Sequence, residues 1–296
     1  MNLGIDVGGT SIKAGVVDTQ GNISGIQKFA SDEWATSPEP FLQLLEKICS
    51  AAIKEHAIKG VGIGLPGQLS RDRKSIVALT NLPALNGMAV KSDLQKLFPQ
   101  LKIALENDAR CAAMAEMHFG AHGEKDFLLI TLGTGVGGGL VIDGKLFMGA
   151  NGNPTEVGMI PVGLGAFLED YIGNKHIVAF TQELLKEHTT SSLKNKEDLS
   201  VADIYEAAKA GDACALAVFN FVGSRLGEAM LSMIHLYDVS TLIIGGGIGA
   251  AFDLLKPPVM EVLNKRLLPY YTKNLKVLPA SLHNESGIVG AASLVH

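Results

Sequence analysis

The hydrophobic pattern of the chain consists of short apolar runs that end in glycine-rich turns, separated by stretches with helical periodicity. The first run begins at Leu3, carries Asp6 and leads into a turn at residues 8–10, and a second apolar run returns after Lys13. This pattern is typical of a β-hairpin with a polar tip. Residues 22–29 then predict a third strand.

The rest of the chain shows the same two patterns, short apolar runs and apolar residues at helical spacing. Short buried runs predict further strands at residues 61–65, 103–106, 127–131, 140–142 and 241–244. Helical spacing of apolar residues predicts helices at residues 40–56, 109–119, 200–210, 212–237 and 286–294. Strands that alternate with helices indicate an α/β fold.

The opening turn carries groups that suit phosphate and magnesium. Gly8 and Gly9 let backbone N–H groups approach an anion closely, and Thr10 adds a hydroxyl donor. The carboxylate of Asp6 can hold Mg²⁺ directly or through water. An ordinary tight turn with a solvated Asp6 gives the same local pattern.

Two further glycine turns end predicted strands. Residues 133–139 repeat the opening order of strand, Gly/Thr tip and strand, so the two hairpins suggest two lobes that each present a phosphate-binding turn to one nucleotide. Residues 245–247 form a third turn, where an adenine or ribose could lie on bare backbone or where a helix simply packs on a strand. The spacing of a dinucleotide site occurs at residues 62–67, but Pro66 interrupts it and no helical pattern follows. The lysine of a P-loop is missing after Gly9.

Asn107 and Asp108 stand between a predicted strand and a predicted helix. Either residue type is favoured as a helix N-cap, which is the purely structural interpretation. The functional interpretation is that ligands gather outside the carboxyl ends of strands in open α/β sheets, where an Asp can accept a proton from a substrate hydroxyl.

Composition narrows the class of protein. A chain of 296 residues predicts two lobes, because single cores stop growing near roughly 250–300 residues. The net charge of −5 removes the usual electrostatic reason for binding nucleic acid or an anionic membrane. Three widely spaced cysteines favour buried thiols in a reducing compartment. No basic leader precedes the first strand, and no uncharged stretch is long enough for a bilayer, so we expect a cytoplasmic protein.

Seven stretches, taken in order, resemble the ROK family of sugar kinases and repressors, within the actin-like ATPase superfamily that includes hexokinases. They are LGIDVGGTSIKAGVVD, GIGLPG, ENDARCAAMAE, LGTGVGGGLVIDGKL, GANGNPTEVG, LIIGGGI and SGIVGAA. The resemblance implies two ribonuclease-H-like lobes with ATP in the cleft between them. The smaller lobe would hold residues 1–109, with residues 285–296 returning to it, and the larger lobe residues 110–284. The resemblance also favours a homodimer.

The resemblance assigns roles to individual residues. The implied positions for ATP and Mg²⁺ are Asp6, Gly8, Gly9, Thr10, Lys13, Thr134, Gly135, Gly246 and Gly247. The implied sugar-binding positions are Gly67, Asn81, Asn107, Asp108, Glu156 and Glu169. Asp108 is the implied general base, and Asp6 lies near the magnesium ion. The sequence leaves open whether ATP or polyphosphate is the phosphoryl donor.

One departure from the family concerns a structural zinc. Members commonly bind it through a His that follows the first of these glutamates and through three cysteines. The matching positions here are Met159, Ile160, Val162 and Phe167. A thioether and three hydrocarbons cannot replace imidazole and thiolates, so the sequence predicts no zinc site and a loop held by apolar packing. Because the same His usually touches the sugar, the sugar preference stays open.

Three functions follow from these expectations. The favoured one is an ATP-dependent hexokinase acting on the terminal hydroxymethyl of glucose. The second is a kinase for an N-acetylated hexosamine, mannose or fructose, whose hydroxyls the same carboxylates would bind. The third is a sugar-sensing regulator without catalysis. Such repressors carry a helix-turn-helix before the first strand, whereas this chain starts on that strand, and Asp6 and Asp108 are both present.

Overall fold

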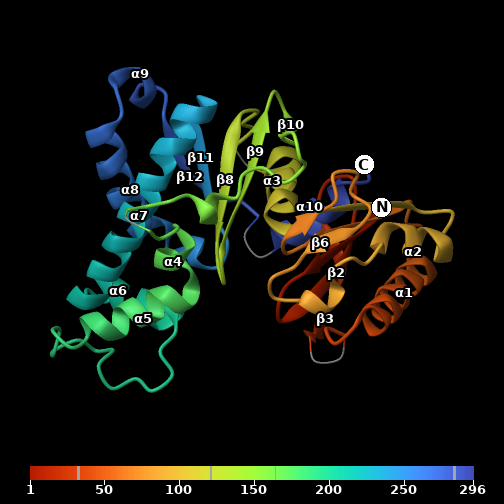
Figure 1. Cartoon of the computed structure of the whole chain (residues 1–296), viewed down its shortest axis with the longest axis horizontal. Coiled ribbons are helices and arrows are strands. Elements are labelled where there is room, and N and C mark those ends of the chain that lie inside the picture. The colour runs from red at the N-terminus through yellow and green to blue at the C-terminus, as the bar shows by residue number, and fades with distance from the viewer. Residues whose placement is uncertain (32–33, 121, 164, 283–284) are drawn as a thin grey trace. The chain divides into compact units, whose positions relative to one another are not determined.

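The computed structural model describes residues 1–31, 34–120, 122–163, 165–282 and 285–296. The chain divides into two compact units. Unit 1 comprises Met1–Lys125, Gly139–Pro154 and Asn284–His296, and unit 2 comprises Asp126–Gly138 and Thr155–His283. Both termini therefore belong to unit 1, as Figure 1 shows. Strands and helices alternate along the chain, which confirms the predicted α/β class.

Unit 1 contains a mixed five-stranded sheet of order β3-β2-β1-β4-β7. Its strands are β1 (Asn2–Val7), β2 (Ser11–Val17), β3 (Ile23–Ala30), β4 (Gly60–Leu65) and β7 (Lys102–Asn107). The predicted hairpin of β1 and β2 is confirmed, and the predicted third strand, β3, pairs antiparallel with β2. β1, β4 and β7 are parallel, so their carboxyl ends lie along one edge of the sheet.

The other elements of unit 1 pack around this sheet (Figure 1). They are α1 (Pro38–Glu55), the small ladder of β5 (Gln68–Leu69) and β6 (Ile76–Ala78), η2 (Pro83–Leu85), α2 (Val90–Leu97), α3 (Asp108–Phe119) and α10 (Ser286–Ser293). The predicted helices α1, α3 and α10 are confirmed. The sequence did not predict α2, which buries only Val90 and Leu94 and so shows a single repeat of the helical period.

Helix α10 returns from the end of the chain and packs against β1, β4 and α3. Glycines make this close approach possible. A Cβ on Gly62 of β4 would lie 1.7 Å from the carbonyl oxygen of Ala291, and a Cβ on Gly290 would lie 1.7 Å from that of Cys111. Glycine is therefore required at both contacts, on β4 where it meets α10 and on α10 where it meets α3.

The second five-stranded sheet has the order β10-β9-β8-β11-β12. Its strands are β8 (Phe127–Leu132), β9 (Val136–Ile142), β10 (Lys145–Leu146), β11 (Thr241–Gly245) and β12 (Lys276–Pro279). β8, β11 and β12 are parallel, so the turns after β8 and β11 are neighbours at one edge. The strand predicted at residues 140–142 begins earlier, because Val136 and the glycines after it already pair.

Most helices belong to unit 2. They are η3 (Val157–Met159), α4 (Glu169–Ile172), α5 (Asn174–Leu184), α6 (Val201–Lys209), α7 (Ala213–Tyr237), η4 (Ile248–Ala251), α8 (Phe252–Arg266) and α9 (Pro269–Thr272). The predicted starts of α6 and α7 are confirmed by their caps: Ser200 and Asp203 form a capping box, and Asp212 accepts from the first N–H groups of α7.

Helix α7, drawn in cyan in Figure 1, is the core helix of unit 2. Among the described helices it alone is long and apolar enough to cross a membrane. It packs instead against α4, α5, α6 and α8, and more than half of its apolar window is buried inside the protein. Gly223 faces Pro258 of α8 and Gly227 faces Val259, so the two helices approach closely.

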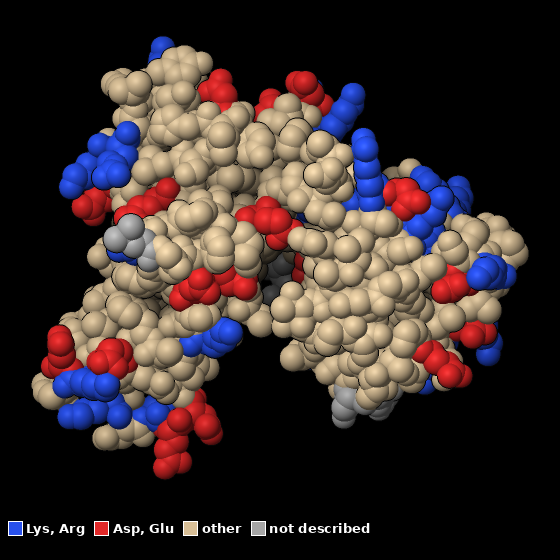
Figure 2. Space-filling view, viewed as in Figure 1, with Lys and Arg blue, Asp and Glu red and all other residues tan. Residues whose placement is uncertain are grey.

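Charged side chains of both signs are interspersed on the face shown in Figure 2. Ion pairs within unit 2 include those of Lys186 with Glu183, Lys196 with Asp203 and Lys209 with Glu206. Exposed pairs of this kind contribute little to stability. They form a solvated surface.

Candidate active site

In unit 1, the carboxyl edge of the sheet collects most of the residues expected from the sequence. Asp6 of β1 is in register with Gly64 of β4, which is in register with Glu106 of β7. Strands lie about 4.8 Å apart, so the ends of β1 and β7 are separated by roughly 10 Å. The turn after Asp6 and the Asn107–Asp108 pair therefore lie at neighbouring positions on this edge.

The first hairpin closes as a tight turn. The N–H of Gly8 donates to the carbonyl of Ser11 at 2.9 Å, which leaves Gly9 and Thr10 at the tip. In this structure the N–H of Gly8 is engaged inside the turn, and its expected role as an amide donor to phosphate stays a prediction. Asn81, an expected sugar contact, lies beside Gly9, since a Cβ there would be 3.5 Å from that of Asn81.

Asp6 is a largely desolvated carboxylate. Its side chain lies against the first turn of α10, because a Cβ on Gly287 would be 2.4 Å from its Oδ2. Burial raises the pKa of Asp6 above its ordinary value, and the ammonium of Lys13, its cross-strand neighbour, lowers it by a smaller amount. A carboxylate that is costly to ionise without a cation suits a magnesium ligand.

We expect Asp6→Asn to raise Tm at pH 7. The stability that a carboxyl with a raised pKa contributes is present below its unfolded pKa, about 3.9, and is lost as pH rises through the folded pKa. At pH 7, above the unfolded pKa, this contribution is reduced or lost, so the buried carboxyl destabilises the fold relative to its stability at low pH, and the amide removes that effect. Thermal unfolding measured between pH 7 and pH 4 should show the difference shrinking as the pH falls.

Asp18→Asn is the matched control, because hydrogen bonds from Asn22 and Gln20 lower the pKa of Asp18. Its effect at pH 7 should have the opposite sign. A lower Tm for Asp6→Asn than for the wild type at pH 7 would contradict the conclusion that burial raises the pKa of Asp6.

Asn107 and Asp108 join β7 to α3. The Oδ1 of Asn107 accepts from the N–H of Arg110 at 3.2 Å, and its Nδ2 donates to the carbonyl of Gly67 at 3.3 Å. Asn107 is therefore a helix cap, as the structural interpretation proposed, and it brings Gly67 to the same place. Asp108 is the first residue of α3, and its Oδ1 accepts from the N–H of Ala109 at 2.8 Å.

Cys111 of α3 is a fully buried thiol beside this edge, and its Sγ would lie 3.2 Å from a Cβ on Gly64 of β4. Burial raises the pKa of the thiol well above the usual range, and the negative charges of Glu106, Asp6 and Asp108 raise it further. Cys111 is therefore an inert structural group, because a buried thiol with a raised pKa is not ionised.

Unit 2 brings a second set of expected residues together. The Thr134–Gly135 turn is closed by a bond from the N–H of Gly133 to the carbonyl of Gly135 at 2.9 Å. Gly246 has φ +82° and packs on the end of β8, where a Cβ would lie 2.3 Å from the carbonyl oxygen of Leu132. The two glycine turns are therefore neighbours, and Gly247 has open space beside it.

Glu169 and Glu156 lie at this same edge of unit 2. The Oε2 of Glu169 accepts from the N–H of Val136 at 2.7 Å, directly beside Gly135. Glu156 is exposed and precedes η3, and Gly158 of that helix lies against Val136. The described geometry gives Glu169 a role in shaping the glycine turn, while its contact with a sugar stays a prediction.

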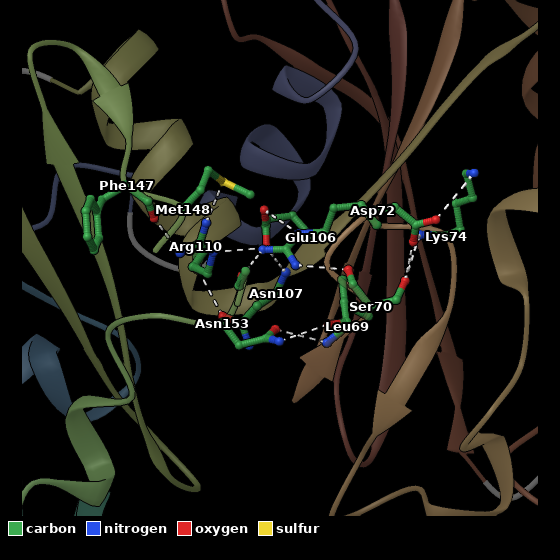
Figure 3. A network of polar contacts seen from close by, with 12 residues as sticks. Leu69, Ser70, Asp72, Lys74, Glu106, Asn107, Arg110, Phe147, Met148 and Asn153 are labelled. Atoms are coloured by element: carbon green, nitrogen blue, oxygen red, sulfur yellow. Dashed lines mark hydrogen bonds and ion pairs between the residues drawn. The ribbon is translucent and has the colours of Figure 1, made fainter. Parts of the chain in front are cut away.

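Sequence reasoning missed three charged residues behind Asn107. Glu106 is almost fully buried and forms ion pairs with Arg73 and Arg110, both at 3.0 Å (Figure 3). The four-residue spacing from Glu106 to Arg110 was a visible signal for one pair. The loop that carries Arg73 gave no such signal.

Comparison with known proteins assigns the whole chain to one family. The model described as the ROK family matches residues 2–296. The chain belongs to the ROK family. This confirms the resemblance that the seven sequence stretches indicated.

Several ROK relatives are similar over nearly the full chain. A glucokinase from Halalkalibacterium halodurans is 32% identical, covering 99% of this chain and 94% of its own. A crystal structure from Cytophaga hutchinsonii is 38% identical, with a TM-score of 0.93 and 99% of each chain covered. The ROK family glucokinase from Streptomyces griseus, in complex with glucose and AMPPNP, is 30% identical with a TM-score of 0.84, covering 99% and 98%. These relatives support an ATP-dependent hexose kinase.

Regulators also occur among the ROK relatives. The DNA-binding transcriptional dual regulator NagC of Escherichia coli is 30% identical over 90% of this chain and 70% of its own. Membership of the ROK family is therefore compatible with both catalysis and regulation.

The loop that carries zinc ligands in many ROK proteins is held here by backbone bonds. The N–H of Val162 donates to the carbonyl of Ala166, and that of Leu168 to the carbonyl of Ile160. Of the four substituted positions only Val162 is buried, while Met159 and Phe167 are 48% and 46% exposed. The expectation of apolar packing is thus correct for Val162 alone. In the described part of the chain, no group of three or more His, Cys, Asp or Glu suits a metal.

Proposed function

We propose that this chain transfers the γ-phosphoryl group of ATP to the terminal hydroxymethyl of a hexose, with glucose as the preferred acceptor. The observation that carries the proposal is the edge of unit 1 where Asp108, Asn107 and the turn after Asp6 converge. The relatives named glucokinase support the substrate. We propose the cytoplasm as the compartment.

The residues of unit 1 fit the nucleotide and its metal. Gly9 and Thr10 form a bare turn tip, and Asp6 offers a hard oxygen ligand that burial leaves poorly solvated. When bound, ATP with Mg²⁺ supplies the transferable phosphoryl group and neutralises part of its charge. In unit 2, Thr134, Gly135, Gly246 and Gly247 are proposed nucleotide contacts.

The protein's own part in the reaction is positioning and proton transfer. Asn107, Glu156 and Glu169 hold the hexose hydroxyls, and Asp108 accepts the proton of the attacking hydroxyl. Phosphoryl transfer asks for little covalent chemistry from the protein, so these roles suffice. Asp108 is suited to them because the capped start of α3 fixes its backbone.

Identifying the phosphorylated sugar that the protein produces tests the proposed function. Purified protein would be incubated with Mg-ATP and, in separate reactions, with glucose, mannose, fructose, N-acetylglucosamine and N-acetylmannosamine. Phosphorus NMR should show a phosphate monoester on the terminal hydroxymethyl of glucose, with slower formation from the others. A second series with polyphosphate identifies the donor. A phosphate on the anomeric oxygen, or none on any sugar, would contradict the proposal.

The relationship to NagC makes a sugar-sensing regulator the second candidate. It predicts hexose binding without ATP turnover and binding to DNA that changes with the sugar. A gel-shift series over a DNA panel, with and without each hexose, separates it from the kinase.

A further inference from the structure

A buried ion-pair network lies directly behind the proposed catalytic residues (Figure 3). We call Arg73, Glu106 and Arg110 the arginine network. The Nε of Arg73 donates to Oε2 of Glu106, and the Nε of Arg110 donates to Oε1, each at 3.0 Å. Arg110 and Glu106 are 2% and 3% exposed. Two guanidinium groups therefore share one carboxylate away from water.

Further donors of both arginines reach a second segment of unit 1, residues 147–153, while the Nη1 of Arg73 donates to the carbonyl of Ser70 at 3.3 Å. Arg110 donates from Nη1 to the carbonyl of Phe147 at 2.9 Å, and its Nη2 contacts the sulfur of Met148 at 3.0 Å. Arg73 donates from Nη2 to the carbonyl of Gly152. The buried charges are satisfied only while this segment keeps its place.

Asn153 adds a further attachment for the same segment. Its Oδ1 accepts from the N–H of Leu69 at 3.1 Å, and its Nδ2 donates to the carbonyl of Leu69 at 2.9 Å. Both bonds go to the end of β5, directly before the turn that carries Arg73. Segment 147–153 is thus joined to two separate parts of unit 1, the β5 region and the start of α3.

The network also bonds to Asn107, the residue directly before the proposed base Asp108. The Oε1 of Glu106 accepts from the N–H of Asn107 at 2.9 Å as well as from Arg110. Asn107 in turn caps Arg110, so the backbone that leads into Asp108 is fixed at both ends. A shift of Arg110 must therefore move both the start of α3 and segment 147–153.

We propose that Arg110, acting through Glu106 and segment 147–153, is a positioning residue for hexose binding. The inference rests on the proposed function. Segment 147–153 leads through Pro154 and Thr155 to Glu156, a proposed sugar contact, and the other end of the network holds Asn107 and Asp108. The network bonds described above involve neither Gly9 nor Thr10, so its loss should act on the hexose rather than on ATP.

Arg110→Lys tests the proposal in the full-length protein. The ammonium keeps the charge but cannot bond Glu106, Phe147 and Met148 together, because it lacks the planar fork of a guanidinium. We expect the KM for glucose to rise about tenfold, in line with the sensitivity of catalysis to small displacements, while kcat falls less and the KM for ATP stays within about twofold. Arg225→Lys, at a half-buried arginine of α7, is the matched control and should change none of these.

Asn153→Ala keeps the test informative if Arg110→Lys folds poorly. It removes the attachment of segment 147–153 to Leu69 without leaving a buried charge unpaired, and it should also raise the KM for glucose. The proposal is overturned if both variants lower Tm but leave the KM for glucose unchanged, or if the KM values for glucose and ATP rise together. A wild type that turns over no hexose rejects the proposed function itself, whereas an active wild type with unmoved variants rejects only this inference.

Discussion

We expect Asp108→Asn to lower kcat by roughly 10²–10⁴-fold with hexose binding largely retained, because a positioned general base contributes about that factor. The amide has the size of the carboxylate and keeps the oxygen that accepts from the N–H of Ala109. It cannot take up the proton of the attacking hydroxyl. Steady-state rates with saturating Mg-ATP and glucose, together with calorimetric binding of glucose, measure the two effects separately.

Asp93→Asn is the control for this substitution. Asp93 also lies in the first turn of a helix of unit 1, but it forms a surface ion pair with Lys96. Its kcat should match the wild type. A near-normal kcat for Asp108→Asn would remove Asp108 from the role of base.

Gly62→Ala destabilises the protein by about 3 kcal/mol. Overpacking in a core typically costs 1–3 kcal/mol, and this site lies at the upper end because the added methyl meets backbone rather than a movable side chain. The new Cβ would lie 1.7 Å from the carbonyl oxygen of Ala291, so α10 must move away from β4. Thermal or urea unfolding should show the loss, accompanied by lower soluble yield.

Gly249→Ala provides the comparison for this prediction. Its added Cβ would lie 3.5 Å from the carbonyl group of Ile244, which is ordinary van der Waals contact. The expected change in stability is small. Equal stability of Gly62→Ala and the wild type would show that α10 can shift without loss, against the close packing described here.

The strands and turns of the candidate site were predictable because their signal is local. Glycine pairs after apolar runs predicted the turns at Gly8–Gly9 and Gly133–Gly135, and both are present. The caps of α6 and α7 were equally visible, since Ser200 and Asp212 precede their helices directly. In each case the residues that determine the turn or the helix start lie within a few positions of it in the sequence.

Other features depend on partners that are distant in the sequence. Helix α8 contains Pro257 and Pro258, which interrupt any helical pattern, yet it packs closely on Gly223 and Gly227 of α7. Arg73 lies between β5 and β6, and its ion-pair partner Glu106 lies near the end of β7. Neither partner reveals the other in the sequence.

Some hydrogen-bonding atoms of the predicted site residues already have partners within the fold. The N–H of Gly8 and the Oε2 of Glu169 are engaged within their own units. Sequence motifs identify which residues gather at a site, but not which of their atoms the fold already uses. The ligand contacts proposed for Gly8, Thr10 and Asp108 therefore stay predictions.

The most direct measurement is the rate of ADP release from Mg-ATP by the wild type and by Asp108→Asn, with and without glucose. We expect ADP release by the wild type to depend on glucose. We expect Asp108→Asn to lose this glucose-dependent release while still binding glucose, as measured by calorimetry. ADP release that is independent of sugar, or glucose binding without any turnover by the wild type, would contradict the claim that this ROK protein is a hexose kinase.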